Sequence, residues 1–369
     1  MSVSLPEIQP AFAWGIFKES SRPMLIAGPC SAESEEQVYT TATQLKQQGI
    51  SVFRAGIWKP RTRPHTFEGI GEKGLPWLQR VQQELGMKIS TEVANGHHVE
   101  TALNMGIDLL WVGARTSTNP FAVQEVADAL KGTDIPVLVK NPVISDIGTW
   151  LGAIERLVLA GVTKIGAIHR GFQVYRDSKY RNMPQWQIPI ELKQCCKTIS
   201  LFCDPSHIGG NSLYIKEICQ KSMDLGFDGL MIESHCSPEA ALSDASQQVT
   251  PAKLYHILSQ LIIRNSSFSG VPDSSTIEHF RGQIDALDNM LLETLAQRMQ
   301  IVEEIGEYKK RHNITILQAD RWEEIIRRMV QQAKIHRIDP ELVKNLFESI
   351  HQASIDKQTE IMNSDEIKG

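Results

Sequence analysis

The chain has 369 residues, a length that favours two domains. Of these residues 41% are hydrophobic and 22% charged, a composition that is ordinary for a globular protein with a sizeable buried core. Its formal net charge of -5 excludes a global basic field for nucleic acid or anionic membranes, so anions have to be bound by local clusters of cations. No run reaches the roughly 18 apolar residues of a membrane span, the start lacks a secretory-signal pattern, and the six cysteines show no CxxC spacing, so we expect a cytoplasmic protein without disulfides.

Eight short apolar and β-branched runs follow one another along the first two-thirds of the chain. They occupy residues 24–30, 51–56, 88–93, 109–114, 136–141, 164–171, 199–207 and 229–235. Segments of helical period, each ending at a glycine, lie between most of them, as at 35–49, 121–132 and 213–226. Alternating strands and helices predict a parallel sheet, and eight units match a (β/α)8 TIM barrel of the α/β class. The alternative, an open doubly wound sheet, favours a GxGxxG turn after the first strand, where the sequence has GPCSAES.

Unusual polar residues stand at the ends of these strands, where TIM barrels build their active sites. Every strand contributes at least one, the clearest being Cys30, Arg54, Glu92, Arg115, Lys140, His169, Asp204 and Glu233. Polar residues scattered at random would not all fall at one rim. The sequence therefore predicts the active site at this end of the barrel.

Four residues at this rim predict a metal site. Cys30, His207 and Glu233 come from the first, seventh and eighth strands, and the eighth strand of a barrel closes beside the first. Asp244 lies in the loop after the eighth strand. A thiolate, an imidazole and two carboxylates suit a divalent ion such as Mn, Fe, Co or Zn, with manganese as first choice, rather than an all-oxygen magnesium site.

Six cations share the same rim, namely Arg54, Lys59, Arg61, Arg115, Lys140 and Arg170. Arginine binds phosphate and carboxylate groups with a planar fork, and lysine acts as a point charge or a proton donor. A surface salt bridge with a helix carboxylate is the alternative for each cation alone. For the whole set, a barrel mouth is a poor place to meet acids on the helix surface, so we expect an anion-binding mouth.

The motifs AGPCS, RAGxxKPRT, WVGART, VLVKN, IHRGF, DPSHIGG, MIESH and SDASQ, in this order over about residues 15–263, resemble a known family. They are similar to the shorter, barrel-only subfamily of 3-deoxy-D-arabino-heptulosonate 7-phosphate synthases, the first enzymes of the shikimate pathway. The resemblance implies condensation of phosphoenolpyruvate with erythrose 4-phosphate, with Cys30, His207, Glu233 and Asp244 as metal ligands. The related octulosonate-phosphate synthases are the alternative, but their second-strand motif resembles KANR where this chain has KPRT.

The same resemblance implies roles for the other rim residues. It places phosphoenolpyruvate against Arg54, Lys59, Arg115, Lys140, Arg170 and the peptide N–H of Ala114. It places the aldose phosphate at Arg61 and Thr62, with Pro60 of the same motif among the substrate contacts. We expect Lys59 to donate a proton to the developing alkoxide and Glu92 to handle the water that adds at the enol carbon.

A Ser-, Gly- and Pro-rich run at 264–275 predicts a flexible linker between a synthase domain at 1–263 and an all-helical domain at 276–369. We expect helices over about 276–311 and 318–337, and a third starting with Asp339 as N-cap and Pro340 in the first turn. The first helix carries an apolar stripe at Ile284, Leu287, Leu291, Leu295, Val302 and Ile305. Arg298 and Lys309 fall in or beside this stripe, and snorkelling of each side chain to water is the alternative for either alone.

The segments RGQIDALDNMLLETLAQR, EYKKR, QADRW and FESIHQASIDKQ resemble the all-helical class of chorismate mutases over about residues 276–360. The resemblance implies a Claisen rearrangement of chorismate to prephenate without a cofactor. It implies a pocket lined by Arg281, Arg298, Lys309, Arg321, Ser354 and Gln358. Gln318 and Trp322 stand where an acid and a glutamate are usual, so we expect Gln318 to contact the substrate and the ring hydroxyl to be recognised differently.

The spacing of two pocket residues predicts a homodimer. Arg281 and Lys309 lie 28 residues apart, which is about 42 Å along one helix, so both can serve one small ligand only if Arg281 comes from a second chain. The helical domains are then expected to form an intertwined dimer. The alternative is that this domain is only a dimerisation and regulatory module that binds chorismate or prephenate. We expect both roles to coexist, with feedback on the synthase as a coupling between two sites.

Overall fold

The structure of the chain is a computed structural model that describes residues 8–17, 22–60, 66–174, 178–264 and 274–364. The chain divides into two compact units, Met1–Ser266 and Ser267–Gly369. The first unit is a closed barrel and the second is helical, as predicted. None of the helices in the described ranges combines the length and apolar character needed to cross a lipid bilayer.

Eight parallel strands close the barrel in chain order, which confirms the TIM barrel and excludes the doubly wound sheet. Their bounds are β1 (Met24–Gly28), β2 (Val52–Arg54), β3 (Lys88–Val93), β4 (Leu109–Val112), β5 (Val137–Lys140), β6 (Ile165–His169), β7 (Ser200–Cys203) and β8 (Gly229–Glu233). β1 and β7 end before their predicted boundaries, so Cys30 and His207 lie just beyond a strand rather than within it. Both are therefore at the rim that faces substrate in this fold.

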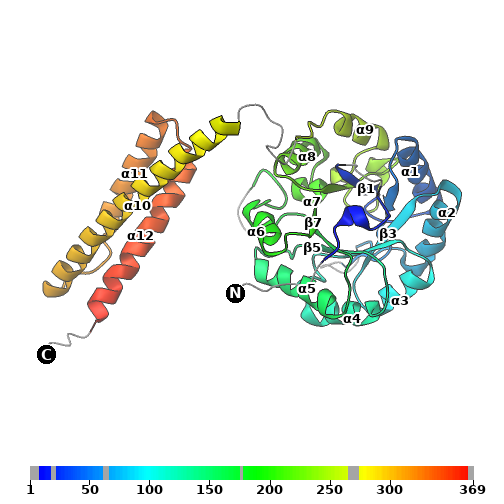
Figure 1. Cartoon of the computed structure of the whole chain (residues 1–369), viewed down its shortest axis with the longest axis horizontal. Coiled ribbons are helices and arrows are strands. Elements are labelled where there is room, and N and C mark those ends of the chain that lie inside the picture. The colour runs from blue at the N-terminus through cyan, green and yellow to red at the C-terminus, as the bar shows by residue number, and fades with distance from the viewer. Residues whose placement is uncertain (1–7, 18–21, 61–65, 175–177, 265–273, 365–369) are drawn as a thin grey trace. The chain divides into compact units, whose positions relative to one another are not determined.

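In the described part of the first unit, nine α-helices surround the strands (Figure 1). They are α1 (Glu35–Gln47), α2 (Leu75–Leu85), α3 (Gly96–Asn104), α4 (Pro120–Leu130), α5 (Ile147–Leu159), α6 (Gln187–Cys195), α7 (Pro205–Gly209), α8 (Ile215–Asp224) and α9 (Pro251–Ser259). Ser34, Asn95, Asn119 and Asp146 each accept a backbone N–H bond at a helix start, which satisfies donors that the helix itself leaves unpaired. The segment predicted as one helix over 213–226 is a 3-10 turn followed by α8.

The barrel interior is filled and is closed at one end by the N-terminal segment. Its core includes Trp14, Phe17, Ile26, Val52, Leu109, Trp111, Leu138, Ile168, Phe202 and Met231. The Ala11 N–H donates to Ser200 Oγ at 2.8 Å, which ties the segment to the start of β7. Because the aromatic rings of Trp14 and Phe17 fill this end, the polar cavity of the barrel lies at the other end.

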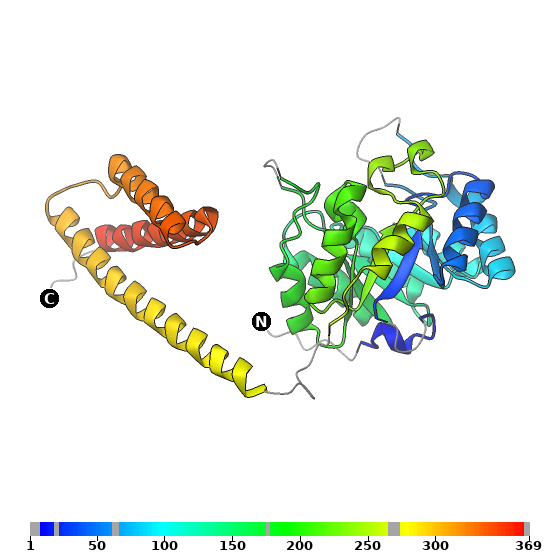
Figure 2. The same cartoon turned by 90° about the horizontal axis from the view of Figure 1, so that it is seen from above.

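The second unit consists of α10 (Ser274–Arg311), α11 (Ala319–Ile335) and α12 (Pro340–Asn363), with Asp339 capping the third helix as predicted. α12 packs against both other helices, and Figure 2 shows the N-terminal part of α10 extending beyond them. The apolar stripe therefore changes character along α10. Val302 is buried, whereas Ile284, Leu287 and Leu291 are between 57% and 61% exposed.

Candidate active sites

A polar cavity of about 350 Å³ opens at the carboxyl ends of the barrel strands. Its lining contains nine of the residues that the sequence predicted, namely Lys59, Pro60, Glu92, Ala114, Arg115, Lys140, Arg170, His207 and Asp244. Cys30, Arg54 and Glu233 do not line it but are buried. Arg61 and Thr62 lie outside the described residues, so their predicted roles have no structural description.

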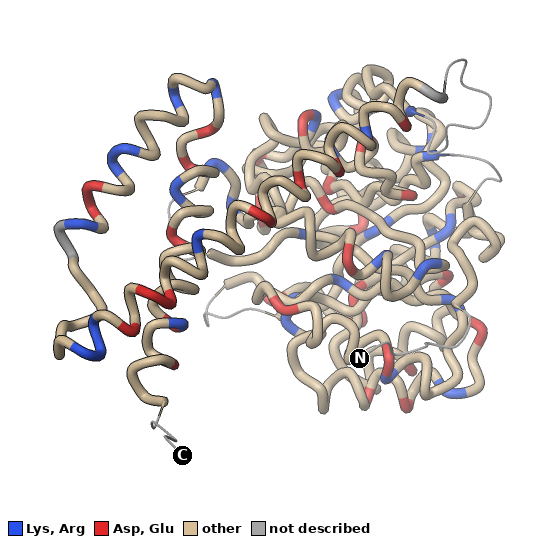
Figure 3. Tube along the Cα trace, turned by 60° about the vertical axis from the view of Figure 1, so that its left-hand side comes forward, with Lys and Arg blue, Asp and Glu red and all other residues tan. Residues whose placement is uncertain are grey.

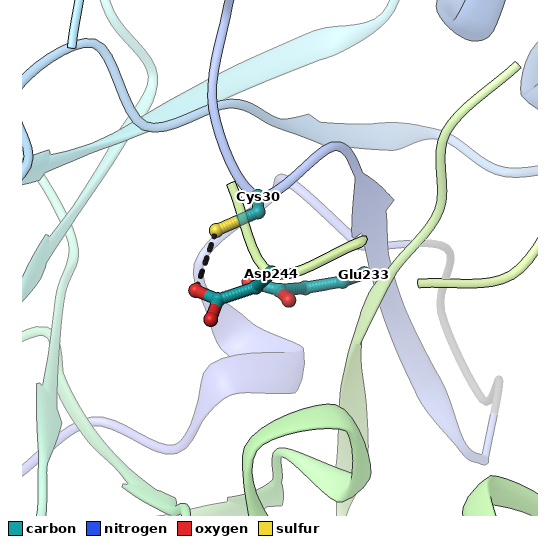
Figure 4. Close-up of side chains that lie close together, drawn as sticks. All are labelled: Cys30, Glu233 and Asp244. Carbon is teal, nitrogen blue, oxygen red and sulfur yellow. Dashed lines mark hydrogen bonds between the residues drawn. The ribbon is translucent and has the colours of Figure 1, made fainter. Parts of the chain in front are cut away.

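Cys30, Glu233 and Asp244 each offer a ligand atom within 4.8 Å of the other two (Figure 4). Cys30 Sγ lies 3.3 Å from Asp244 Oδ2, and His207 Nε2 lies 3.8 Å from Glu233 Oε1. Barrel closure explains the meeting, because the register of β1 on β8 pairs Gly28 with Glu233. The structure thus brings together the four residues predicted as metal ligands.

Asp244 reaches this cluster through a loop that folds back onto the barrel. The His235 N–H donates to Val249 O at 3.0 Å, and the Val249 N–H donates to Glu233 O at 3.1 Å. Asp244 itself has a φ of +47°, a left-handed conformation that is uncommon for a residue with a side chain. Such strain concentrates at functional sites, where surrounding contacts hold it in place.

The donor set fits a divalent metal ion. Burial, together with the charge of Glu233, raises the pKa of the Cys30 thiol to about 12, so the thiol needs a nearby cation to ionise at neutral pH. A bound metal deprotonates a coordinating thiol. His207 Nδ1 lies 2.8 Å from Asp204 Oδ2, and a carboxylate behind a histidine is the usual outer contact of a metal ligand.

Two of the predicted cations are already paired inside the barrel. Arg54 Nη2 lies 3.2 Å from Glu233 Oε1, with both side chains fully buried, and Lys140 Nζ lies 2.7 Å from Asp204 Oδ2. The acids are at strand ends rather than on helices, which differs from the salt bridges considered in the sequence. Among the described residues, Arg54 Nε and Nη1 have no hydrogen-bond partner although both are buried. A buried donor of this kind is costly unless a ligand accepts its bond.

Two glycines explain the motifs around these residues. A Cβ on Gly113 would lie 2.0 Å from Glu92 Oε1, so the glycine in WVGART leaves room for the Glu92 carboxylate. A Cβ on Gly28 would lie 2.0 Å from the carbonyl oxygen of Arg54. Only glycine allows β1 and β2 to approach this closely and to bring Cys30 and Arg54 to one site.

Arg181 lines the cavity, although the sequence analysis did not single it out. Its Nη1 donates to Asp244 Oδ1 at 2.9 Å. Asn182, also missed, accepts from Arg170 Nη1 at 2.8 Å and so orients a predicted substrate contact. Both come from the long segment between β6 and α6, which carries no strand or helix pattern. The basic run RDSKYR, which ends at Arg181, is the sequence feature that could have indicated a binding role for this segment.

His169 stands at a strand end but is not part of the cavity lining. It is fully buried, and its ring lies between 5.3 and 6.5 Å from those of Trp150, Phe172, Trp186 and Phe227. Burial lowers the pKa of His169 to about 3, so the ring is neutral. It packs with aromatic side chains, because side chains at successive strand positions point to opposite faces of the sheet.

In the helical unit, α10 and α12 bring three predicted mutase residues together. Arg298 Nη1 donates to Ser354 Oγ at 2.7 Å, and Gln358 Nε2 donates to Ser354 O at 3.2 Å. Ser354 and Gln358 are buried, and Gln358 Oε1 has no partner among the described residues. Ser354 and Gln358 thus lie within the packed helices, and the partly buried Arg298 bonds to Ser354.

The remaining mutase residues are more exposed. Lys309 and Gln318 line a second cavity of about 580 Å³, and Lys309 Nζ donates to Ile316 O at 2.5 Å. Arg321 pairs with Glu324 at 2.6 Å and Arg281 pairs with Glu278 at 2.5 Å, both on the helix surface. The predicted separation of Arg281 and Lys309 holds, since α10 is helical from Ser274 to Arg311.

Trp322 stacks on His351, with ring centroids 3.9 Å apart and an angle of 9° between planes. This aromatic pair occupies the region where the resemblance led us to expect a glutamate. Burial, with Arg298 and Lys309 nearby, lowers the pKa of His351, which keeps this ring neutral. The pair joins α11 to α12 at this end of the helical unit.

The first unit is a barrel in which candidate metal ligands lie beside cations, and the second unit is helical. This combination is typical of a two-domain enzyme. Residues 14–267 match the model of the DAHP synthetase I family, and residues 280–359 match that of chorismate mutase type II. The chain therefore belongs to the DAHP synthetase I family and carries a chorismate mutase domain. These two matches confirm both resemblances.

Similar proteins agree with the barrel assignment. The chain is 32% identical over 225 residues to a phospho-2-dehydro-3-deoxyheptonate aldolase of Thermotoga maritima, covering 61% of this chain and 64% of the relative. A crystal structure of that enzyme type from Thermotoga maritima shows 28% identity and a TM-score of 0.61, over 69% of this chain and 72% of that one. The chain is also 26% identical to a 2-dehydro-3-deoxyphosphooctonate aldolase of Wolinella succinogenes, over 65% of this chain and 98% of the relative. The match thus spans a little under two-thirds of the Thermotoga relative's sequence.

Proposed function

We propose that the chain catalyses two reactions of the shikimate pathway at separate sites. The barrel condenses phosphoenolpyruvate with erythrose 4-phosphate, and the helical domain converts chorismate to prephenate. The observation that carries the first reaction is the cluster of Cys30, Glu233 and Asp244, with His207 beside Glu233, next to a cavity lined with cations. Acidic and basic residues are interspersed along the rest of the trace (Figure 3), so the concentration of cations at the cavity is local to it.

The barrel residues divide between the metal and the anions. Cys30, His207, Glu233 and Asp244 would hold the divalent ion, for which we propose manganese. When bound, the ion polarises the aldehyde carbonyl as a Lewis acid. The phosphate and carboxylate of phosphoenolpyruvate bind to Arg115, Lys140, Arg170 and the Ala114 peptide N–H. Arg54 supports these groups from a buried position outside the cavity lining. Holding both substrates in attack geometry supplies much of the rate enhancement.

Lys59 is the proposed proton donor to the alkoxide that forms from the aldehyde. Its Nζ lies 3.1 Å from Cys30 Sγ, next to the proposed metal site. Burial lowers the pKa of Lys59, but the negative charges of Glu92, Glu233 and the ionised form of Cys30 outweigh it and raise the pKa, so the ammonium keeps its proton. A Lys59→Met variant should retain metal binding and lose about 100-fold or more in kcat. Turnover at the normal rate would show that another group donates the proton.

Glu92 is the proposed partner of the water that adds at the enol carbon. It lines the cavity, and the space left by Gly113 fixes where its carboxylate lies. A carboxylate close to the reacting carbon can accept a proton from that water. Glu92 also contributes to the charge that keeps Lys59 protonated, so the two groups have complementary roles.

The aldose decides between the heptulosonate and octulosonate reactions, and relatives of both kinds are similar to this chain. The KPRT motif at 59–62 favours the four-carbon aldose. We expect condensation with erythrose 4-phosphate to exceed that with arabinose 5-phosphate by at least about 100-fold in kcat/KM, the range that a pocket mismatch supplies. Enzyme assays with each aldose, read by loss of phosphoenolpyruvate, test this. A preference for arabinose 5-phosphate would reverse the assignment.

In the helical domain, Arg281, Arg298 and Arg321 would bind the two carboxylates of chorismate in its compact conformer. Lys309 and Gln358 would meet the negative charge that grows on the ether oxygen, and such preorganised donors accelerate the reaction without proton transfer. Burial of Gln358 and the Arg298–Ser354 bond support this over a purely regulatory domain. Chorismate conversion by the full chain distinguishes the two, because a regulatory module would bind chorismate unchanged.

We propose that the helical domain also forms an intertwined homodimer. Ile284, Leu287 and Leu291 are exposed on the N-terminal part of α10, and an apolar stripe of this kind is normally covered by another helix. A second copy of α10 would cover it and deliver Arg281 to the other chain's site. The same domain is proposed to transmit feedback, so that prephenate lowers synthase activity in the full chain and has no effect after truncation at the linker.

A further inference from the structure

Gln247, which is buried, joins two of the proposed metal ligands through a chain of hydrogen bonds that includes the partly exposed Arg181. Its Nε2 donates to Glu233 Oε2 at 2.7 Å, and its Oε1 accepts from Arg181 Nη1 at 2.9 Å. The same Arg181 nitrogen donates to Asp244 Oδ1 at 2.9 Å. Gln247 is fully buried, so neither end of its amide exchanges this contact for water.

An amide satisfies both neighbours of Gln247. An ionised carboxylate accepts hydrogen bonds and a guanidinium only donates them, so the bridging side chain has to donate at one end and accept at the other. Glutamate would set a second carboxylate against Glu233, and asparagine is one methylene shorter. This requirement also fixes which end of the Gln247 amide is oxygen.

Gln248, the next residue, also bonds through both ends of its amide, and one of these bonds is to the backbone of Cys30, the third proposed ligand. Gln248 Oε1 accepts from the Cys30 N–H at 2.9 Å, and its Nε2 donates to Ser243 O at 2.9 Å. The two glutamines thus connect the turn that follows Asp244 to the segments that carry Glu233 and Cys30. The Gln247 N–H also donates to Asp244 O at 3.1 Å, which closes the turn.

We infer that Gln247 is a positioning residue that holds Glu233 and Asp244 at the spacing of a metal site before the ion binds. The inference rests on the proposed metal-dependent function and adds a residue to it. Gln247 does not contact the ion or the substrate. It acts through the carboxylate of Glu233 and through the Arg181–Asp244 pair, and contacts behind metal ligands of this kind tune metal affinity.

Titration of the metal-free full-length protein with Mn²⁺, followed by calorimetry, tests this role directly. Gln247→Met keeps the volume of the side chain and removes both bonds, and we expect its dissociation constant to rise by about 10- to 100-fold. Gln247→Asn keeps the amide but cannot reach both partners, and it should weaken binding in the same direction. The melting temperature of each metal-free variant shows separately that the barrel is folded.

Gln37→Met is the matched control. Gln37 is a buried glutamine whose amide bonds only to the backbone, at the Glu33 N–H and Ser31 O. It should lower the melting temperature and leave the Mn²⁺ dissociation constant unchanged. Wild-type affinity in folded Gln247→Met and Gln247→Asn proteins, or an equal loss in Gln37→Met, would overturn the role of Gln247. Absence of Mn²⁺ binding by the wild-type protein would instead overturn the proposed metal site.

Discussion

A Cys30→Ser variant is expected to lose at least about 100-fold in metal affinity and synthase activity, because a serine hydroxyl is a harder and far less acidic donor than a thiol. Cys30 Sγ lies 3.3 Å from Asp244 Oδ2 and 3.1 Å from Lys59 Nζ, so it is central to the proposed centre. Conversion of chorismate by the same protein should not change. Metal content measured after dialysis, alongside both assays, checks the expectation.

Cys219→Ser supplies the matched control. Cys219 is also fully buried, and burial raises the pKa of its thiol, but it lies on α8 in the apolar layer of the barrel. The substitution should destabilise the fold, since it buries a hydroxyl in an apolar place, and leave metal affinity unchanged. A Cys30→Ser protein that keeps a full metal complement would refute the ligand assignment.

Mixing two inactive mutase variants is expected to restore activity. Arg281→Ala and Lys309→Ala should each lower chorismate turnover by at least about 100-fold, because the first removes a group that binds a substrate carboxylate and the second a group that meets the developing charge. In a mixed dimer, one site combines the intact Arg281 of one chain with the intact Lys309 of the other. Random exchange of subunits makes about half of the dimers mixed and so restores about a quarter of all sites.

The control for this experiment is a mixture in which complementation is impossible. Lys309→Ala mixed with Arg298→Ala should stay inactive if both residues serve the site from the same chain. The Arg298–Ser354 bond and the second cavity at Lys309 place both residues in the same three-helix unit. Failure of Arg281→Ala and Lys309→Ala to complement, in dimers shown by sedimentation to have exchanged, would contradict the intertwined assembly.

Much of the barrel site could be predicted because it follows from topology. Strand ends converge in a parallel barrel, and closure places β8 beside β1. Cys30 follows the end of β1 by two residues, so it lies close to Glu233 at the end of β8. Asp244 was a candidate because its loop follows the eighth strand, but the sequence pattern of that loop does not itself show that it folds back over the rim. The three helices were predictable from their spacing and from the Asp339–Pro340 cap.

The residues that were missed depend on tertiary contacts without a local pattern. Arg181 lies in a long irregular segment, and Gln247 acquires its role only when Glu233 and Arg181 are both in place. The pairing of Arg54 with Glu233 and of Lys140 with Asp204 was also not predicted. Ion pairs between strand ends of different barrel strands cannot be read from sequence spacing.

The most direct test of the two-site account is to measure both reactions in one preparation before and after treatment with a metal chelator. We expect synthase activity to disappear and to return on adding Mn²⁺, because the ion is held by the barrel cluster. Chorismate conversion should continue unchanged throughout, since the proposed helical site relies on side chains of the protein and on no metal ion. Synthase turnover that survives complete removal of metal, or mutase activity that falls with it, would contradict the account.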